Sequence, residues 1–249
     1  MPGKPRSPYS IWYRLAAAIV KPILFVFVRR HWRGYEHIPA EGGFITVVNH
    51  ISYLDPLTYG HFQYQSGRPA RLLAKASLFG IPFVGLMLRR TGQIPVHRGT
   101  ADAALALRDA VDAVSRGECV AIYPEGTVTR DPGMWPTAGK TGAARIALTT
   151  GVPVIPVAQW GAHRIVPPYA RGGPGDRRLR LVPRTPVHVV AGPPVDLSRH
   201  EGRPLTSDVL KEATEDIMAA ITALLADIRG EEPPAGHCCA RRSPHERAM

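Results

Sequence analysis

The 249-residue sequence contains few cysteines. Cys119 lies in an apolar run, whereas Cys238 and Cys239 are neighbours in a polar tail, so the sequence predicts no disulfide framework and favours a reducing compartment. His237 precedes that pair, but no second group of ligands at zinc-like spacing accompanies it. We therefore expect neither a disulfide-stabilised scaffold nor a metal site.

The chain also lacks an apolar run long enough to span a bilayer. Its most apolar stretch, residues 9–33, is interrupted by Arg14 and Lys21, and Pro22 should break or kink a helix there. A spanning helix needs about 20 apolar residues, and a signal peptide needs a continuous apolar core with a cleavage site. We therefore expect a chain that does not cross the membrane.

The same stretch interleaves aromatic and basic side chains, an arrangement that suits the interface of a membrane. Aromatic rings sit at the depth of the lipid headgroups while cations face anionic lipid, so two short helices meeting near Pro22 would form an interfacial anchor over residues 1–40. The alternative is a hairpin packed on its own domain, and the interleaving favours the membrane. The aromatic residues are Trp12, Tyr13, Phe25, Phe27 and Trp32, and the basic ones are Arg14, Lys21, Arg29, Arg30 and Arg33.

Acidic residues are scarce relative to basic ones, with 20 Asp and Glu against 31 Lys and Arg and a formal net charge of +11. This surplus favours an anionic partner, and nucleic acid, anionic lipid and a CoA-like carrier are all candidates. The densest basic stretch of the second half, residues 171–184, resembles no module that binds RNA. We therefore expect no nucleic acid partner, and we expect an anionic membrane surface to be one.

The chain as a whole has the composition of a packed protein, with 45% apolar and 20% charged residues. From residue 44 onward, β-rich runs alternate with helical segments, which is the pattern of an α/β domain. We expect this domain to cover residues 41–230 and a disordered tail to cover residues 231–249. Strands are predicted at 44–48, 71–74, 93–96, 119–123, 154–158 and 187–191, and helices at about 100–117, 139–150 and 207–230.

The segment FITVVNHISYLDP places His50 directly after an apolar strand and Asp55 at the start of a helix. Asp55 could then accept the Nδ1 proton of the imidazole and leave Nε2 free as a base, and a histidine pKa of about 6.5 suits proton removal from a hydroxyl. The spacing alone is weak evidence, because His97 and Asp102 share it. On this segment alone, a structural pair that caps the helix is an equal alternative.

A serine nucleophile is disfavoured, because the sequence contains no G-x-S-x-G turn. Ser52 is too close to His50 in sequence for triad geometry to be assumed. If the segment is catalytic, acyl transfer without a covalent enzyme intermediate is the favoured chemistry.

Four blocks between residues 44 and 158 resemble the glycerolipid acyltransferase family, which includes the 1-acylglycerol-3-phosphate acyltransferases. They are NHISYLD at 49–55, GQIPVHRG at 92–99, YPEGTVTR at 123–130 and VPVIPVA at 152–158. The resemblance implies a mixed β-sheet enclosed by helices, to which the expected N-terminal two-helix, membrane-associating hairpin is joined. It also implies that His50 is the general base and that Asp55 orients it.

The resemblance further implies which residues bind the acceptor phosphate. Arg98 of the second block matches a phosphate-binding arginine of the family, and Lys75 matches a lysine between the first two blocks. A lysophosphatidate headgroup is a dianion, so its capture needs several converging cations. Arg130 is a third candidate.

The third block departs from the usual E-G-T-R-S pattern of the family. Val128 stands where the arginine would be, and Arg130 follows two residues later, so the role of Arg130 stays open. Glu125, Gly126 and Thr127 match the block and are expected to line the substrate site. Because a carboxylate repels phosphate, Glu125 is expected to hold a cation or an acceptor hydroxyl.

These expectations together describe acyl transfer from acyl-CoA or acyl-carrier protein to lysophosphatidate, giving phosphatidate. No cofactor is expected beyond that co-substrate, and the enzyme is expected to be peripheral or monotopic at the cytoplasmic face of the cell membrane. The alternative acceptors are glycerol-3-phosphate, another lysophospholipid or a glycolipid. A non-catalytic lipid-binding protein on the same fold is the alternative from another class.

Overall fold

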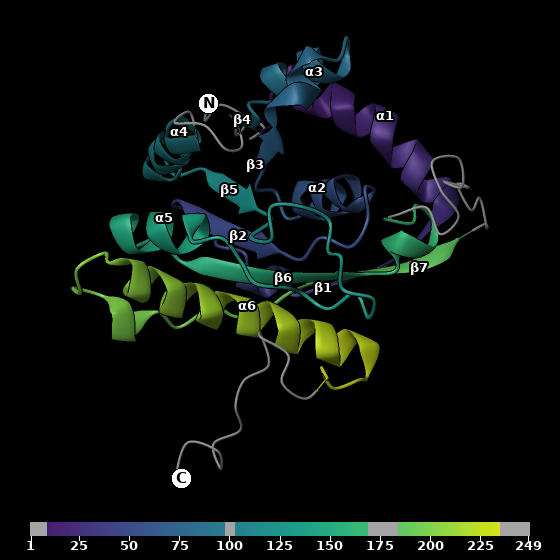
Figure 1. Ribbon diagram of the computed structural model, residues 1–249. Coiled ribbons are helices and arrows are strands. Elements are labelled where there is room, and N and C mark those ends of the chain that lie inside the picture. Colours follow the sequence, from purple (N-terminus) through teal and green to yellow (C-terminus); the bar gives the residue numbers. More distant parts are fainter. Residues whose placement is uncertain (1–8, 98–102, 169–183, 235–249) are drawn as a thin grey trace, which may run out of the picture.

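The computed structural model describes residues 9–97, 103–168 and 184–234. Within these residues a seven-stranded sheet has the order β1-β7-β6-β2-β5-β3-β4 (Figure 1). Strand pairs are parallel except β6 with β7, which run antiparallel, so the expected mixed α/β sheet is confirmed. The strands are β1 (Val28–Arg33), β2 (Phe44–Val48), β3 (Ala70–Lys75), β4 (Ile94–Val96), β5 (Cys119–Ile122), β6 (Val154–Trp160) and β7 (Thr185–Ala191).

Helices cover both faces of this sheet. All of β2 is buried, so its alternate residues face opposite cores: Ile45 and Val47 pack with α4, α5 and α6, whereas Phe44 and Val48 pack with α2. Figure 1 shows α2 on one side of the sheet and α5 and α6 on the other. The helices are α1 (Ile11–Phe27), α2 (Asp55–Gln65), α3 (Val84–Arg90), α4 (Ala103–Ser115), α5 (Gly142–Thr150) and α6 (Ser207–Arg229).

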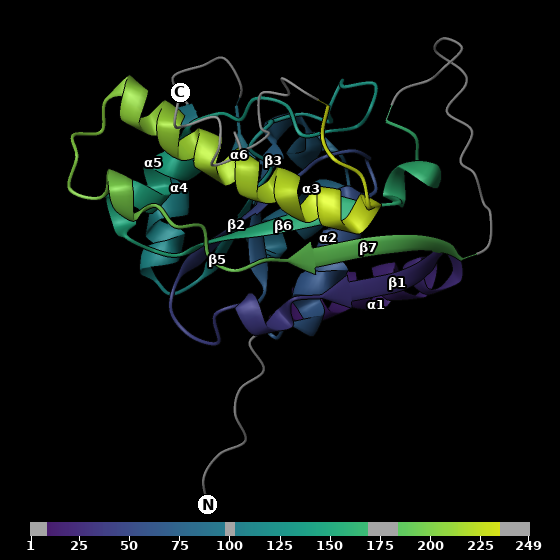
Figure 2. The ribbon, with the colours of Figure 1, turned by 90° about the horizontal axis from the view of Figure 1, so that it is seen from below.

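The N-terminal segment corrects one prediction. In place of two short helices, α1 runs without a break through Pro22. Residues 28–33 form β1, which pairs in parallel with β7 at the edge of the sheet (Figure 2), so the two-helix hairpin is wrong. Its second half is a strand because Val28 packs against Val187 of β7, a contact that arises only in the folded chain. The domain boundary predicted at residue 40 stays a prediction. Strand β1 lies before that boundary but belongs to the seven-stranded sheet of the domain.

Helix α6 confirms the apolar stripe expected near the C-terminus. Leu210, Ala213, Ile217 and Ile221 are all buried against the sheet, and Gly230 ends the helix in the left-handed conformation. Within the described residues, no helix has both the length and the apolar character needed to cross a membrane. The 3-10 helix η2 (Ala76–Gly80) and α3 were not predicted; they form one compact corner after β3.

Candidate active site

His50 and Asp55 meet at the end of β2, where the chain turns into α2. His50 Nδ1 lies 2.9 Å from Asp55 Oδ2, and the same oxygen accepts the backbone N–H groups of Ile51 at 2.6 Å and Ser52 at 2.7 Å. The loop is therefore folded around the carboxylate. The Asp55 side chain is fully buried, and the His50 side chain is 14% exposed. Because Nδ1 faces Asp55, Nε2 is the ring nitrogen available to a substrate.

The electrostatics of this pair depend on burial. Loss of water raises the pKa of Asp55 above its ordinary value, and the hydrogen bonds from His50, Ser52 and Ile51 oppose that shift. The carboxylate therefore depends on the imidazole and on the two backbone amides for its charged form. A buried carboxylate that orients a histidine and stabilises its imidazolium is the arrangement used in general-base catalysis.

Tyr123, which follows β5, packs against the imidazole of His50. Its ring stacks on that of His50, with centroids 4.4 Å apart and planes 28° apart. Asp55 Oδ1 is buried without a hydrogen-bond partner among the described residues, and the buried Tyr123 hydroxyl lies near the side chain of Gln159. Burial and then the charge of Asp55 raise the pKa of Tyr123 well above its ordinary value, so the phenol stays neutral.

Gln159 of β6 links α2 to the strand end that carries His50. Its Oε1 accepts the hydroxyl of Thr58 at 2.8 Å, and Asn49 bonds its backbone N–H at 2.6 Å and its backbone carbonyl at 3.0 Å. All three side chains are buried. Gln159 was missed as a site residue, because only the order of strands in the sheet places it near the dyad. Tyr123 was also missed, although it is the first residue of the third block.

Glu125 of the third block positions the histidine through its backbone. Its Oε1 accepts the N–H of His50 at 3.2 Å, and its Oε2 accepts the backbone N–H and the hydroxyl of Thr137 at 3.1 and 3.0 Å. Burial raises the pKa of Glu125, and these hydrogen bonds oppose the shift. Its contact with a cation or a substrate hydroxyl stays a prediction. Gly126 has φ 70°, as expected for a tight turn after the strand.

A cavity of about 1150 Å³ opens beside His50, and its walls come from α1, α2, β3, α3 and the third block. Most of its lining side chains are apolar. Arg130 does not line it, and Arg98 lies outside the described residues. The cavity brings together four of the predicted site residues, namely His50, Lys75, Gly126 and Thr127.

Lys140 lines the same cavity and was also missed. Its Cε and Nζ lie 3.0 and 3.2 Å from the place that a Cβ would take at Gly126, so its side chain crosses the turn that the glycine makes possible. Its backbone N–H donates to the carbonyl of Pro124 at 2.8 Å, which ties it to the third block. Val128 also faces this cavity. A signal was present in the sequence, because Lys140 is the sole basic residue between Arg130 and Arg145.

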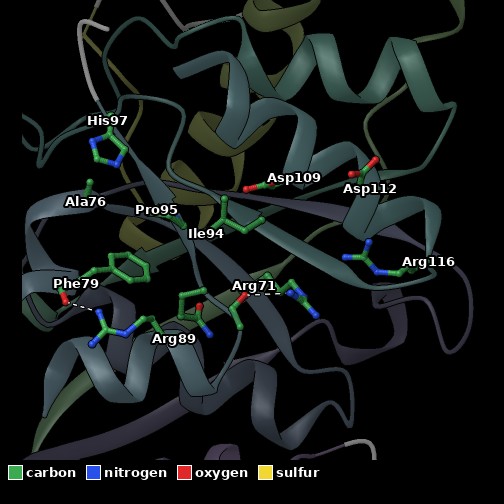
Figure 3. Close-up of a pocket in the computed structure, with 12 residues that line it drawn as sticks. Arg71, Ala76, Phe79, Arg89, Ile94, Pro95, His97, Asp109, Asp112 and Arg116 are labelled. Atoms are coloured by element: carbon green, nitrogen blue, oxygen red, sulfur yellow. Dashed lines mark hydrogen bonds between the residues drawn. The ribbon is translucent and has the colours of Figure 1, made fainter. Parts of the chain in front are cut away.

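His97 lies in a different pocket, with a volume of about 640 Å³, between β4 and α4 (Figure 3). Polar side chains line that pocket, among them Arg71, Arg116 and Asp112, and the first two pair with Glu118. The spacing that His97 shares with His50 therefore does not bring it into the site. Its partner in that spacing, Asp102, lies outside the described residues.

Known proteins share both the sequence around this site and the fold. A family model described as "Acyltransferase" matches residues 29–160, which contain His50, Asp55 and the third block. A solved structure with a similar fold is the 1-acyl-sn-glycerophosphate (LPA) acyltransferase PlsC from Thermotoga maritima, at 26% identity and a TM-score of 0.60 over 90% of this chain and 80% of that one.

Curated relatives share the central part of the chain. A chloroplastic 1-acyl-sn-glycerol-3-phosphate acyltransferase of Brassica napus is 29% identical over 182 residues, covering 72% of this chain and 50% of the relative. The 1-acyl-sn-glycerol-3-phosphate acyltransferase of Borreliella burgdorferi is 36% identical over 131 residues, covering 52% of this chain and 50% of the relative. The chain thus spans about half the length of these curated relatives.

Proposed function

The chain belongs to the acyltransferase family, and from that premise we propose that it transfers a fatty acyl group from a thioester carrier to the free hydroxyl of lysophosphatidate, giving phosphatidate. The observation that carries this proposal is the His50–Asp55 pair, whose Nδ1 and Oδ2 atoms lie 2.9 Å apart, with His50 lining a large apolar cavity. The pair supplies a base for a hydroxyl, and the cavity suits the hydrocarbon of the substrates. The carrier is acyl-CoA or acyl-carrier protein, and no further cofactor takes part.

The reaction uses Nε2 of His50 as the base. As the acceptor hydroxyl loses its proton to Nε2, its oxygen bonds to the thioester carbonyl carbon and the carbonyl electrons move onto oxygen. When the carbonyl reforms, the carbon–sulfur bond breaks and the thiolate takes the proton back from the imidazolium. Asp55 holds the imidazole in the productive tautomer and stabilises its charged form between the two steps.

The acceptor phosphate is held by lysines that line the cavity from two segments of the chain. Lys75 ends β3, and the Lys140 side chain crosses Gly126 of the third block. Both lysines line the cavity, so their ammonium groups can contact an anion bound there. Charge-assisted hydrogen bonds to phosphate oxygens are stronger than neutral ones, and two or more cations suit a dianion. Arg98 remains a predicted member of this group.

Membrane association is part of the same proposal. Helix α1 exposes Ile11, Leu15, Ile23, Phe25 and Val26, and it also lines the cavity, which suits an enzyme that takes lipid substrates from a bilayer surface. We place the enzyme at the cytoplasmic face of the cell membrane as a peripheral or monotopic protein with an anionic lipid surface as its partner.

A turnover screen tests the proposal. Acyl-CoA and acyl-carrier protein are each offered with lysophosphatidate, glycerol-3-phosphate, lysophosphatidylcholine and a glycolipid, and products are identified by mass. We expect phosphatidate to form fastest, and the folded His50→Ala variant to form almost none. Faster acylation of another acceptor would mean that lysophosphatidate is not the preferred substrate. Lipid binding without turnover of any acceptor would mean that the protein is a lipid-binding protein on this fold and not an enzyme.

A further inference from the structure

Exposed apolar side chains are concentrated on the elements that wall the cavity beside His50. Among the described residues, every exposed large apolar side chain except Leu105 and Leu205 lies on α1, at the start of α2, or on the segment of residues 76–90 that η2 and α3 form. Single exposed apolar residues are ordinary, whereas a contiguous group of them indicates a surface that binds a membrane, another protein or a ligand. The members on residues 76–90 are Leu78, Ile81, Phe83, Val84 and Leu86.

This group is continuous with α1 and with the cavity. The Arg90 guanidinium of α3 lies 5.2 Å from the centroid of the Trp12 ring of α1, and Figure 1 shows the two helices meeting at the end of the molecule away from α6. The cavity beside His50 is walled by both helices, with Ile19 on α1 and Val84 on α3 among its lining residues. A hydrocarbon chain in that cavity would therefore pass between two exposed apolar elements.

The turn before α3 has a strained backbone at Phe83, and the Phe83 side chain is exposed. Phe83 has φ 62° and ψ −54°, and the N–H of Val84 donates to the carbonyl of Pro82 at 2.7 Å, which is a classic γ-turn, a rare conformation for a residue with a side chain. Gly85 permits it, because a Cβ there would lie 2.1 Å from the Phe79 carbonyl oxygen. Phe83 itself is 59% exposed, so packing among the described residues does not account for the strained turn.

The charges on this surface identify its partner. Residues 76–90 and α1 contain no Asp or Glu, whereas Arg89 and Arg90 end α3 and Arg14 lies on α1, all three exposed. Apolar side chains beside cations, with no acidic group among them, complement anionic lipid headgroups above hydrocarbon. A second copy of this chain would instead bring like charges together, because the formal net charge is +11.

We propose that residues 76–90 are a second membrane-inserting element, which inserts into an anionic bilayer beside α1, so that the cavity opens directly onto the bilayer. The inference rests on the proposed function for the identity of the cavity's occupant, but the contact itself is independent of turnover. It extends membrane binding beyond the N-terminal segment to a part of the catalytic domain.

Ile81 and Leu86 allow a clean test, because both are exposed and neither lines the cavity. The full-length double variant Ile81→Glu/Leu86→Glu is compared with Leu105→Glu/Leu205→Glu, which makes the same charge change at the two exposed leucines outside these elements. Binding is measured by sedimentation with phosphatidylcholine vesicles with and without phosphatidylglycerol, and thermal unfolding verifies that both variants are folded.

We expect the first variant to bind the anionic vesicles at least about tenfold more weakly than wild type, and the control to bind as wild type does. Equal binding by wild type and the first variant would overturn the proposal, as would an equal loss in the control. If wild type binds vesicles without phosphatidylglycerol as tightly as vesicles that contain it, the proposal that the partner is an anionic surface would be wrong. Loss of binding in the first variant alone, in a protein that acylates no acceptor, would retain this contact and refute the proposed function.

Discussion

The Tyr123 ring lies against the imidazole of His50, with centroids 4.4 Å apart, while its hydroxyl is buried near the Asp55 carboxylate. The two ends of the side chain therefore have separable effects. We expect the ring to hold the plane of the imidazole, and we expect the hydroxyl dipole to stabilise the charged form of the Asp55 carboxylate, whose pKa burial raises.

Tyr123→Phe retains the ring and removes the hydroxyl, so it separates these effects. Without that dipole the charged carboxylate is less stable, and the dyad takes up a proton at a higher pH. We expect the acidic limb of the kcat/KM profile to move upward by about 0.5 to 1 pH unit, with turnover largely retained at alkaline pH. Tyr123→Leu, which also loses the stacking, should lower turnover at every pH. If the acidic limb of the profile does not shift in Tyr123→Phe, the hydroxyl has no effect on the dyad and only the ring of Tyr123 contributes.

The dyad itself gives a prediction with a larger effect. His50→Ala removes the base and should abolish most turnover, and Asp55→Asn should lower kcat by about 10² to 10⁴, because the amide cannot stabilise the imidazolium. His97→Ala is the matched control, since His97 has the same spacing from a carboxylate but lies in the other pocket. Near-normal kcat in folded His50→Ala would refute the mechanism.

Glu125 offers a prediction about positioning. Its carboxylate joins the backbone of His50 to Thr137. Glu125→Gln presents an amide N–H₂ where one of these donors points, so we expect the imidazole to shift and kcat to fall by about tenfold to a hundredfold, with KM for the acceptor changed little. If Glu125 binds the acceptor hydroxyl directly, as expected from the sequence, the acceptor KM should rise instead. Initial-rate kinetics with the acceptor varied decide between the two.

The sequence predicts those parts of the fold and site whose determinants are local. Strand β2 and the His50–Asp55 pair depend on one strand, one turn and the start of one helix, and the apolar run and the spacing are sufficient for them. Strand β1 could not be found this way: VRRHWR has no alternating apolar pattern, and its pairing with β7 joins residues more than 150 positions apart. The same limit applies to Gln159, which reaches the dyad region only because β6 lies next to β2.

The fold also changes how membrane binding should be tested. Deleting residues 1–34 would remove α1 together with β1, and Leu24 and Val28 are buried in a cluster with Val187 of β7. Such a deletion would disturb the sheet as well as the anchor, so a loss of membrane binding would have two causes. Substituting exposed residues of α1, such as Ile11 and Phe25, by Ser should weaken vesicle binding and leave the thermal midpoint unchanged. A lowered midpoint would show that these side chains pack within the fold.

Lys140 and Val128 give the final prediction, which concerns the cation missing from the third block. Lys140 crosses the Gly126 turn, and both Lys140 and Val128 line the cavity, so the lysine can supply a positive charge on the wall where the family's block has arginine. Losing a charge-assisted hydrogen bond to phosphate costs about 1.5 to 3 kcal/mol, which is about tenfold to a hundredfold in affinity. Lys140→Ala should therefore raise KM for lysophosphatidate by that factor and leave the donor KM unchanged.

Three further variants give this prediction its controls. Arg145→Ala removes an exposed cation of α5 that does not line the cavity, and Arg130→Ala removes the arginine of the third block that does not line it either, so both should retain the wild-type acceptor KM. Adding Val128→Arg to Lys140→Ala should restore part of the lost affinity, because it returns a cation to the same wall. A rise in the donor KM alone in Lys140→Ala would place the lysine on the carrier side. A raised acceptor KM in Arg130→Ala would instead mean that the shifted arginine holds the phosphate.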